Sequence, residues 1–259
     1  MRGDLGCMIT LMKFGSSKEN DMTEPNFNPK NLYLIGGTAA LVQLAAILTY
    51  TIALAVLGPK PASVEEYFIL QQTNRLASVL RGDFLLLLLL APYFGTFPAL
   101  WMALRRISPI ATTFATLFTF VAVTICFASE STFALLHLGD LYAAATSEAQ
   151  RSQLLAAGEA VIAADMWNSS GAYVSGILMQ GGGVIISLVM LRSKEFSKVT
   201  AISGLLGNAF DLIQHVIHPF APSVSSAFMM VMGPFYLVWF PMLARDLFRL
   251  GRGVSSEQR

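Results

Sequence analysis

The feature that most constrains this chain is a series of six long apolar segments. They run over residues 33–57, 84–104, 110–137, 173–191, 199–217 and 227–243. Each is near or above the roughly 18 to 20 residues that a helix needs to cross a lipid bilayer. Because the hydrocarbon offers no water to satisfy backbone polar groups, we expect each segment to be a helix. Strands of a membrane barrel would alternate over about 10 residues each, a pattern that this sequence lacks.

The amino-acid composition fits this class of protein. Hydrophobic residues make up 54% of the chain and charged residues only 13%, and the mean hydropathy is +0.59. Soluble domains are seldom so apolar. We therefore predict an all-α fold, a polytopic transmembrane bundle of six spanning helices over residues 31–251. Residues 1–30 would form a disordered cytoplasmic tail, in which Met22 is a candidate translation start, and residues 252–259 a second cytoplasmic tail.

The basic residues are distributed unevenly between the two sides of such a bundle. With six spans both termini lie on one side, whose tails and loops carry 13 basic residues, whereas the opposite loops carry 4. Cytoplasmic loops are enriched in Lys and Arg, so both termini are predicted to be cytoplasmic and the chain to lie in the cell membrane. We expect the lipid bilayer as a partner, leave open a homo-oligomer or a second membrane protein, and expect no nucleic acid. The 13 residues are Arg2, Lys13, Lys18, Lys30, Arg105, Arg106, Arg192, Lys194, Lys198, Arg245, Arg249, Arg252 and Arg259.

The long loop between the third and fourth spans, residues 139–171, contains a further helical pattern. Ser147 followed by Gln150 forms a capping-box pattern at its start. Good helix formers follow, with apolar residues on one side. The pattern predicts an extra amphipathic helix over residues 147–165 that lies over the outer ends of the spans. Such a helix acts either as a passive interfacial element or as a lid over a site.

The fifth span carries a polar stripe within an apolar segment. Its sequence SGLLGNAFDLIQHVIH places Asp211, His215 and His218 at positions i, i+4 and i+7, so the three side chains project from one helix face. Asn208 continues the stripe. Ionisable residues inside a membrane span are costly and mark candidate functional sites. Polar side chains between spans also serve only to hydrogen-bond neighbouring helices, and this structural interpretation stays open.

A second group of polar residues lies at the outer end of the third span. Glu130 and His137 are seven residues apart and are predicted to share a helix face, and Asp140 follows them. Asp83 opens the second span on the same side. Because the third and fifth spans both run outward, we expect these residues and all three histidines to converge there, with Asp165 nearby. Glu130 either needs a partner in the hydrocarbon or is solvated at the outer water boundary.

Imidazoles and carboxylates grouped in this way indicate two kinds of chemistry. They are ligands of a divalent metal such as zinc, with further polar groups orienting the ligands. They also form proton relays, because His titrates near neutrality and burial shifts carboxylates upward. The candidate ligand or metal-binding residues are Asp211, His215, His218, Glu130 and His137. The candidates for orienting them are Asn208, Asp140 and Asp83.

The sequence contains none of the common catalytic patterns. A His-Glu-x-x-His motif, a Gly-x-Ser-x-Gly elbow, a dinucleotide fingerprint and a Walker loop are all missing, so no catalytic residue is assigned and we do not expect an enzyme. The preferred function is an outward-facing site between spans three and five that binds a metal, a lipid or a small solute. A structural or accessory membrane protein and a proton-coupled small-solute carrier are the alternatives, although no inverted repeat supports transport.

Three stretches carry a resemblance to a known family: NLYLIGGTAALV in the first span, NRLASVLRGDFLLLL leading into the second, and a Gly-rich fourth span that runs through a basic turn into SGLLGNAFDLI. With the long third loop, they make residues 31–251 similar to a bacterial family of six-helix integral membrane proteins known only as a domain of unknown function. The resemblance implies the six-span fold but no activity. The chain departs from that family at residues 193–196, where a Pro is usual, and the Asp-x-x-x-His-x-x-His pattern is not a mark of the family.

Overall fold

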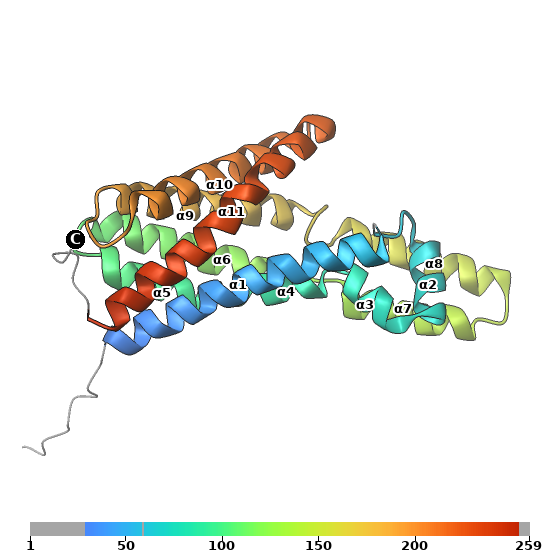
Figure 1. Ribbon diagram of the computed structural model, residues 1–259. Coiled ribbons are helices and arrows are strands. Elements are labelled where there is room, and N and C mark those ends of the chain that lie inside the picture. The colour runs from blue at the N-terminus through green and yellow to red at the C-terminus, as the bar shows by residue number, and fades with distance from the viewer. Residues whose placement is uncertain (1–28, 59, 254–259) are drawn as a thin grey trace, which may run out of the picture.

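The computed structural model describes residues 29–58 and 60–253, in which every regular element is an α-helix. The predicted tail at 1–30, with Met22, lies almost entirely outside these residues, as does most of 252–259. In Figure 1 the helices form an elongated bundle, with the start of α1 and the end of α11 at one end and α2, α7 and α8 at the other. The helices are α1 Pro29–Leu57, α2 Val64–Thr73, α3 Arg75–Arg81, α4 Phe84–Leu90, α5 Tyr93–Leu104, α6 Pro109–Ala128, α7 Thr132–Ala144, α8 Glu148–Ala163, α9 Ser170–Leu191, α10 Lys198–Ile217 and α11 Pro222–Gly251.

Five helical stretches are long and apolar enough to cross a membrane, judged by length and composition. The predicted all-α fold with helices of spanning length is thereby confirmed. The predicted fifth span, α10, is not one of the five, and its polar residues, among them Asp211 and Gln214, account for its lower hydropathy. The five stretches are Pro29–Leu57, Phe84–Leu104, Pro109–Ala144, Ser170–Leu191 and Pro222–Gly251.

Two of the predicted spans are each divided into two helices. α4 and α5 meet at Pro92, which lacks an N–H group and interrupts the helical hydrogen bonds. Residues 129–131 separate α6 from α7. The prediction that Glu130 and His137 share one helix face is therefore wrong, because Glu130 lies in this break and only His137 lies on α7.

The main apolar core lies between α1, α5, α6, α9 and α11, where the rings of Trp239 and Phe240 are almost completely buried. Glycines let α9 approach two of its neighbours closely. A Cβ on Gly182 would collide with the α6 backbone at Ala115, and a Cβ on Gly183 would collide with the Asn208 side chain of α10. Small residues at such positions are the usual means of close helix packing in membranes.

Helices α2, α3, α7 and α8 form a separate unit, which we call the helical lobe. α8 begins with a capping box, in which Ser147 accepts from the backbone of Gln150 and the Gln150 side chain accepts from the backbone of Ser147. Gly158 leaves room for α8 to lie against α2. Figure 1 shows that α8 prolongs the bundle beside α7 and α2 instead of lying across the ends of the predicted spans. The core residues of the lobe are Val64, Tyr67, Phe68 and Leu135.

Candidate functional site

Polar side chains from α9, α10 and α11 meet at the hydroxyl of Tyr236 inside the bundle. Tyr236 Oη lies 2.9 Å from Asp211 Oδ2, 3.0 Å from Gln180 Oε1 and 3.4 Å from Asn208 Oδ1. All three oxygens are acceptors, and a phenol has one proton to donate. We expect the carboxylate to receive it, because hydrogen bonds to a charged acceptor are stronger. We call this group, with His215, the Asp211 cluster.

His215 lies against the same carboxylate. Its Nδ1 is 2.9 Å from the backbone oxygen of Asp211 and 3.1 Å from Asp211 Oδ1. Because both neighbours are acceptors, Nδ1 carries a proton. The ring is directed at the backbone oxygen, so the buried Oδ1 has the ionic contact with the imidazole but no hydrogen-bond donor among the described residues. The ring packs against Gly176 of α9, where a Cβ would overlap it.

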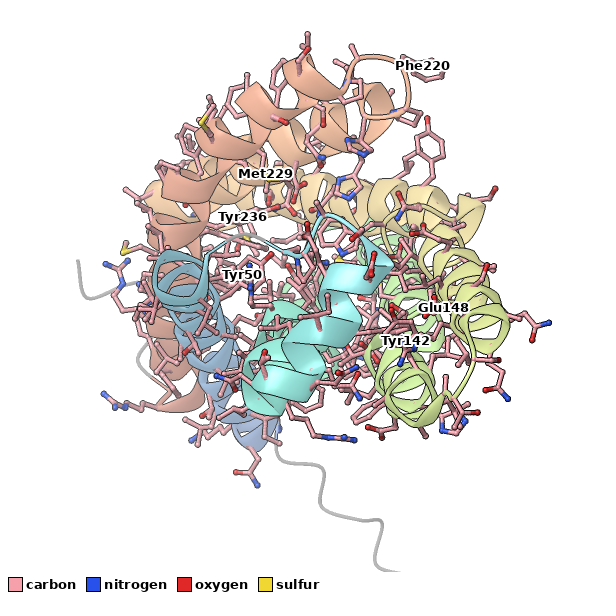
Figure 2. The ribbon with its side chains drawn as sticks, turned by 90° about the vertical axis from the view of Figure 1, so that its right-hand side faces the viewer. Tyr50, Tyr142, Glu148, Phe220, Met229 and Tyr236 are labelled. Carbon is pink, nitrogen blue, oxygen red and sulfur yellow. The ribbon has the colours of Figure 1, made fainter. Side chains whose placement is uncertain are left out.

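His218, the third member of the predicted stripe, does not join the Asp211 cluster. α10 ends at Ile217, and His218 Nδ1 lies 3.3 Å from Ser225 Oγ, at the start of α11. Ser225 is also bonded to Gln214. In Figure 2 the turn between α10 and α11, marked by Phe220, lies at the top of the view, well above Glu148 in the helical lobe. His218 therefore stabilises the turn between α10 and α11.

The predicted partners on the third span lie elsewhere. Glu130 Oε1 accepts from the backbone N–H of Thr132 at 2.7 Å, which helps to start α7. His137 is an exposed residue of α7. Asp140, one turn further along, accepts from Arg75 at 2.7 and 3.1 Å and from Gln71 at 2.8 Å within the helical lobe. Among the described residues, no hydrogen bond or ion pair joins Glu130, His137 or Asp140 to Asp211, so the expected convergence does not form.

The predicted metal site finds no geometric support in the part of the chain that the structure describes. No group of three or more His, Cys, Asp or Glu side chains there is arranged to hold a metal ion. Asp211 and His215 form a pair, whereas Glu130 and His218 bond to separate partners. A structural zinc ion takes four ligands and a catalytic one takes three from the protein.

Asp83, predicted only to orient other ligands, lines a pocket of about 340 Å³ between α1, α4 and the helical lobe. Its Oδ1 accepts from the indole Nε1 of Trp167 at 2.8 Å and also binds the ammonium of Lys60. The same ammonium lies over the Trp167 ring, 5.2 Å from its centroid. We call this the lobe pocket. Its other lining residues are Tyr50, Pro61, Tyr67, Ser131, Leu135, Ile162, Asp165 and Asn168.

Local backbone structure holds the walls of the lobe pocket in place. Asp165 Oδ1 accepts from the backbone N–H of Trp167 at 2.8 Å and of Asn168 at 2.9 Å, a turn that presents the indole between α8 and α9. Tyr67 donates to the backbone oxygen of Ser78 at 3.2 Å. Burial raises the pKa of the Tyr67 phenol, and the charge of Asp83 acts in the same direction. The hydroxyl is therefore neutral at physiological pH.

The lining of the lobe pocket carries more negative than positive charge. Asp83 and Asp165 face one cation, Lys60. The charges of Glu130 and Arg81 act on the pKa of Tyr67 in opposite directions. The Asp83 side chain is only 6% exposed, whereas Lys60 is 35% exposed. The pocket thus offers a buried carboxylate and aromatic faces, and its one lining cation reaches in from the edge.

Several residues of both sites escaped sequence reasoning. Gln180 and Tyr236 lie on different helices from Asp211, and only tertiary packing brings them to it. Gln180 was nevertheless a detectable signal, because an amide within an apolar span needs a partner. Lys60 and Trp167 are 107 residues apart in sequence, and no spacing rule connects them.

Comparison of the chain with protein-family models, with curated proteins and with solved structures finds no match. The resemblance to the uncharacterised bacterial family therefore remains a prediction, and the functional argument rests on the geometry alone.

Proposed function

We propose that the chain is a multi-pass protein of the cell membrane with six spans, in which α10 joins the five long apolar stretches. α10 packs along α9 and α11: His215 faces Gly176, Asn208 faces Gly183, and Gly204 meets Trp239. A helix in contact with two spanning helices over its whole length crosses the same layer. The uneven distribution of basic residues supports cytoplasmic termini. In this orientation the helical lobe and its pocket face outward.

The lobe pocket is the site of function in this proposal, and it binds a small organic cation. One observation carries the proposal: a buried carboxylate and an indole face already hold an ammonium group, that of Lys60. Cations lie favourably within about 6 Å of an aromatic centroid, and recognition of ammonium ligands uses the same geometry. The volume of about 340 Å³ falls within the roughly 300 to 1,000 Å³ of small-molecule sites.

Lys60 acts as an internal occupant of this site. Among the described residues, its ammonium is the only cation that lines the pocket, and its side chain is partly exposed, so it can withdraw into water. A ligand ammonium that replaces it keeps Asp83 paired, so the exchange avoids the penalty of leaving a buried carboxylate alone. The affinity for a soluble amine is then set by competition with Lys60.

Chemical rescue tests this function. Lys60→Ala leaves the Asp83 carboxylate with the neutral Trp167 N–H but without a cation, and is expected to lower the thermal unfolding midpoint of the detergent-purified protein. Ethylammonium or choline should restore it. A ligand present at 100 times its Kd stabilises by about 2.7 kcal/mol. The neutral choline isostere 3,3-dimethylbutan-1-ol and the variant Arg75→Ala, which breaks an ion pair outside the pocket, serve as controls. If Lys60→Ala folds and neither amine changes its thermal unfolding midpoint, the proposal is refuted.

The Asp211 cluster favours a second function, proton-coupled transport of a solute. It places a 5% exposed aspartate, a histidine and a tyrosine within hydrogen-bond reach in a proposed span. Such groups form proton relays in carriers. Proteoliposomes should then show pH-dependent amine uptake that Asp211→Asn abolishes. If uptake persists in that variant, or if Asp211→Asn alters only thermal stability, the cluster serves helix packing.

A further inference from the structure

A second pocket, of about 430 Å³, lies at the end of the molecule opposite the helical lobe (Figure 1). Its lining residues come from the turn between α9 and α10 and from the last part of α11. We call it the α9–α10 pocket. Of the described residues that line it, none is acidic and four are cationic: Arg192, Lys194, Lys198 and Arg249.

Two of these cations are held in place without being neutralised. Lys198 Nζ donates to the backbone oxygen of Leu191 at 2.6 Å, and Arg249 donates to the backbone oxygen of Glu195. Both acceptors are uncharged carbonyl groups. Arg249 Nε is buried and has no hydrogen-bond acceptor among the described residues. These bonds therefore leave the charges of Lys198 and Arg249 in place, and Arg249 has one donor to spare.

The nearby acid Asp246 does not supply the missing negative charge. Its carboxylate is fully buried and accepts from Thr200 Oγ1 at 2.6 Å, from the backbone N–H of Ser197 at 2.9 Å and from Arg245 at 2.9 Å. These bonds fix the start of α10 against α11. Ser197 and Lys198, the first residues of α10, also line the pocket, and the N-terminus of a 20-residue helix adds a partial positive charge.

We propose that the α9–α10 pocket binds a phosphate group, carried by the headgroup of an anionic phospholipid. Arg presents planar paired donors that match phosphate oxygens, and Lys adds point charge. Exposed apolar side chains on the same two helices adjoin the pocket and offer a path for acyl chains: Leu188, Val199 and Ile202. Basic pockets between helices on the cytoplasmic side are sites for such headgroups. This phosphate site rests on the membrane orientation proposed above, but it does not depend on amine binding in the lobe pocket.

Native mass spectrometry of the detergent-purified protein with cardiolipin, and with phosphatidylcholine as the zwitterionic control, tests the site. Each basic residue near an anionic lipid surface contributes roughly fivefold to affinity, so Lys198→Gln with Arg249→Gln should weaken cardiolipin binding about 30-fold. The matched control Arg106→Gln removes an exposed charge outside the pocket and should leave binding unchanged. A fivefold loss in Arg106→Gln, equal per charge to the loss in the double variant, would indicate non-specific attraction and overturn the proposal. Unchanged binding in the double variant would also overturn it.

A second double variant and a competition with inorganic phosphate complete the test. If the double variant does not fold, Arg192→Gln with Lys194→Gln removes two exposed lining charges and should weaken binding to a similar extent. Inorganic phosphate added as a competitor identifies the source of the phosphate. Displacement of cardiolipin at millimolar phosphate would assign the pocket to the free ion and overturn the lipid assignment. Amine binding in the lobe pocket should be the same in all these variants.

Discussion

The Asp211 cluster and the lobe pocket each contain a buried aspartate, yet they satisfy it in different ways. Asp211 is contacted by two groups fixed on helices, the hydroxyl of Tyr236 and the imidazole of His215. Asp83 is paired by a full positive charge on a partly exposed side chain that follows a turn. Desolvation penalises both carboxylates, so each needs a partner.

The difference indicates which aspartate is available to a ligand. No side chain of the Asp211 cluster can leave without opening helix contacts, because α9 packs closely against His215 at Gly176 and against Asn208 at Gly183. Lys60 can leave the lobe pocket by rotating into water. The Asp211 cluster is therefore suited to hold helices and a proton, whereas the lobe pocket is suited to exchange one cation for another.

The largest expected effect comes from opening the α9–α10 contact. Gly183→Val places side-chain atoms where the Asn208 amide lies, and overpacking of this kind costs about 1 to 3 kcal/mol or more. Gly181→Val on the same helix is the matched control, because the space around Gly181 is open. Unfolding by sodium dodecyl sulfate titration should show a large loss for Gly183→Val alone. Similar losses in both variants would mean that the helix tolerates neither β-branched residue, and close packing would not be the cause.

A smaller effect is expected from the hydroxyl at the centre of the Asp211 cluster. Tyr236→Phe leaves Asp211 Oδ2 without its closest donor, at a cost of about 1 to 2 kcal/mol. The control Tyr93→Phe removes a phenol from the same core for which the described residues show no hydrogen bond. The same unfolding titration compares them. Equal stability of the two variants would show that Tyr236 donates to no buried charge.

Much of the fold followed from the sequence because hydrocarbon forces backbone groups to pair locally, so long apolar segments could only be helices. The breaks were harder to locate. Pro92 signalled the kink between α4 and α5, but residues 129–131 contain neither Gly nor Pro. A break there moved Glu130 off the helix and removed the face that it was predicted to share with His137.

The candidate sites were predictable only in part, for a related reason. Helical spacing correctly put Asp211, His215 and Asn208 on one side of α10, because that relation is local. Their partners come from other helices, whose rotation about their own axes is set by packing. Asp83 was noted as polar, but its pairing with Lys60 and Trp167 depends on how the helical lobe folds back, which no local pattern specifies.

The indole of Trp167 provides a finer test of the lobe pocket. Trp167→Phe keeps an aromatic face for the ammonium but removes the N–H that donates to Asp83, and Trp167→Leu removes both. We expect a loss of about 1 kcal/mol for Phe and a further 0.5 to 1 kcal/mol, roughly, for Leu. Choline titration of the Lys60→Ala background measures both steps by calorimetry. If Phe and Leu bind choline equally, the ring face contributes nothing to recognition.

The smallest expected effect comes from the other ion pair of the helical lobe, between Arg75 and Asp140. Two hydrogen bonds, at 2.7 and 3.1 Å, join the guanidinium to both carboxylate oxygens, but the side chains are 59% and 50% exposed. Water and salt screen such pairs. Arg75→Ala should therefore leave the thermal midpoint unchanged within measurement at 150 mM salt, whereas Lys60→Ala lowers it. A drop for Arg75→Ala as large as that for Lys60→Ala would show that burial of Asp83 is not what distinguishes the lobe pocket.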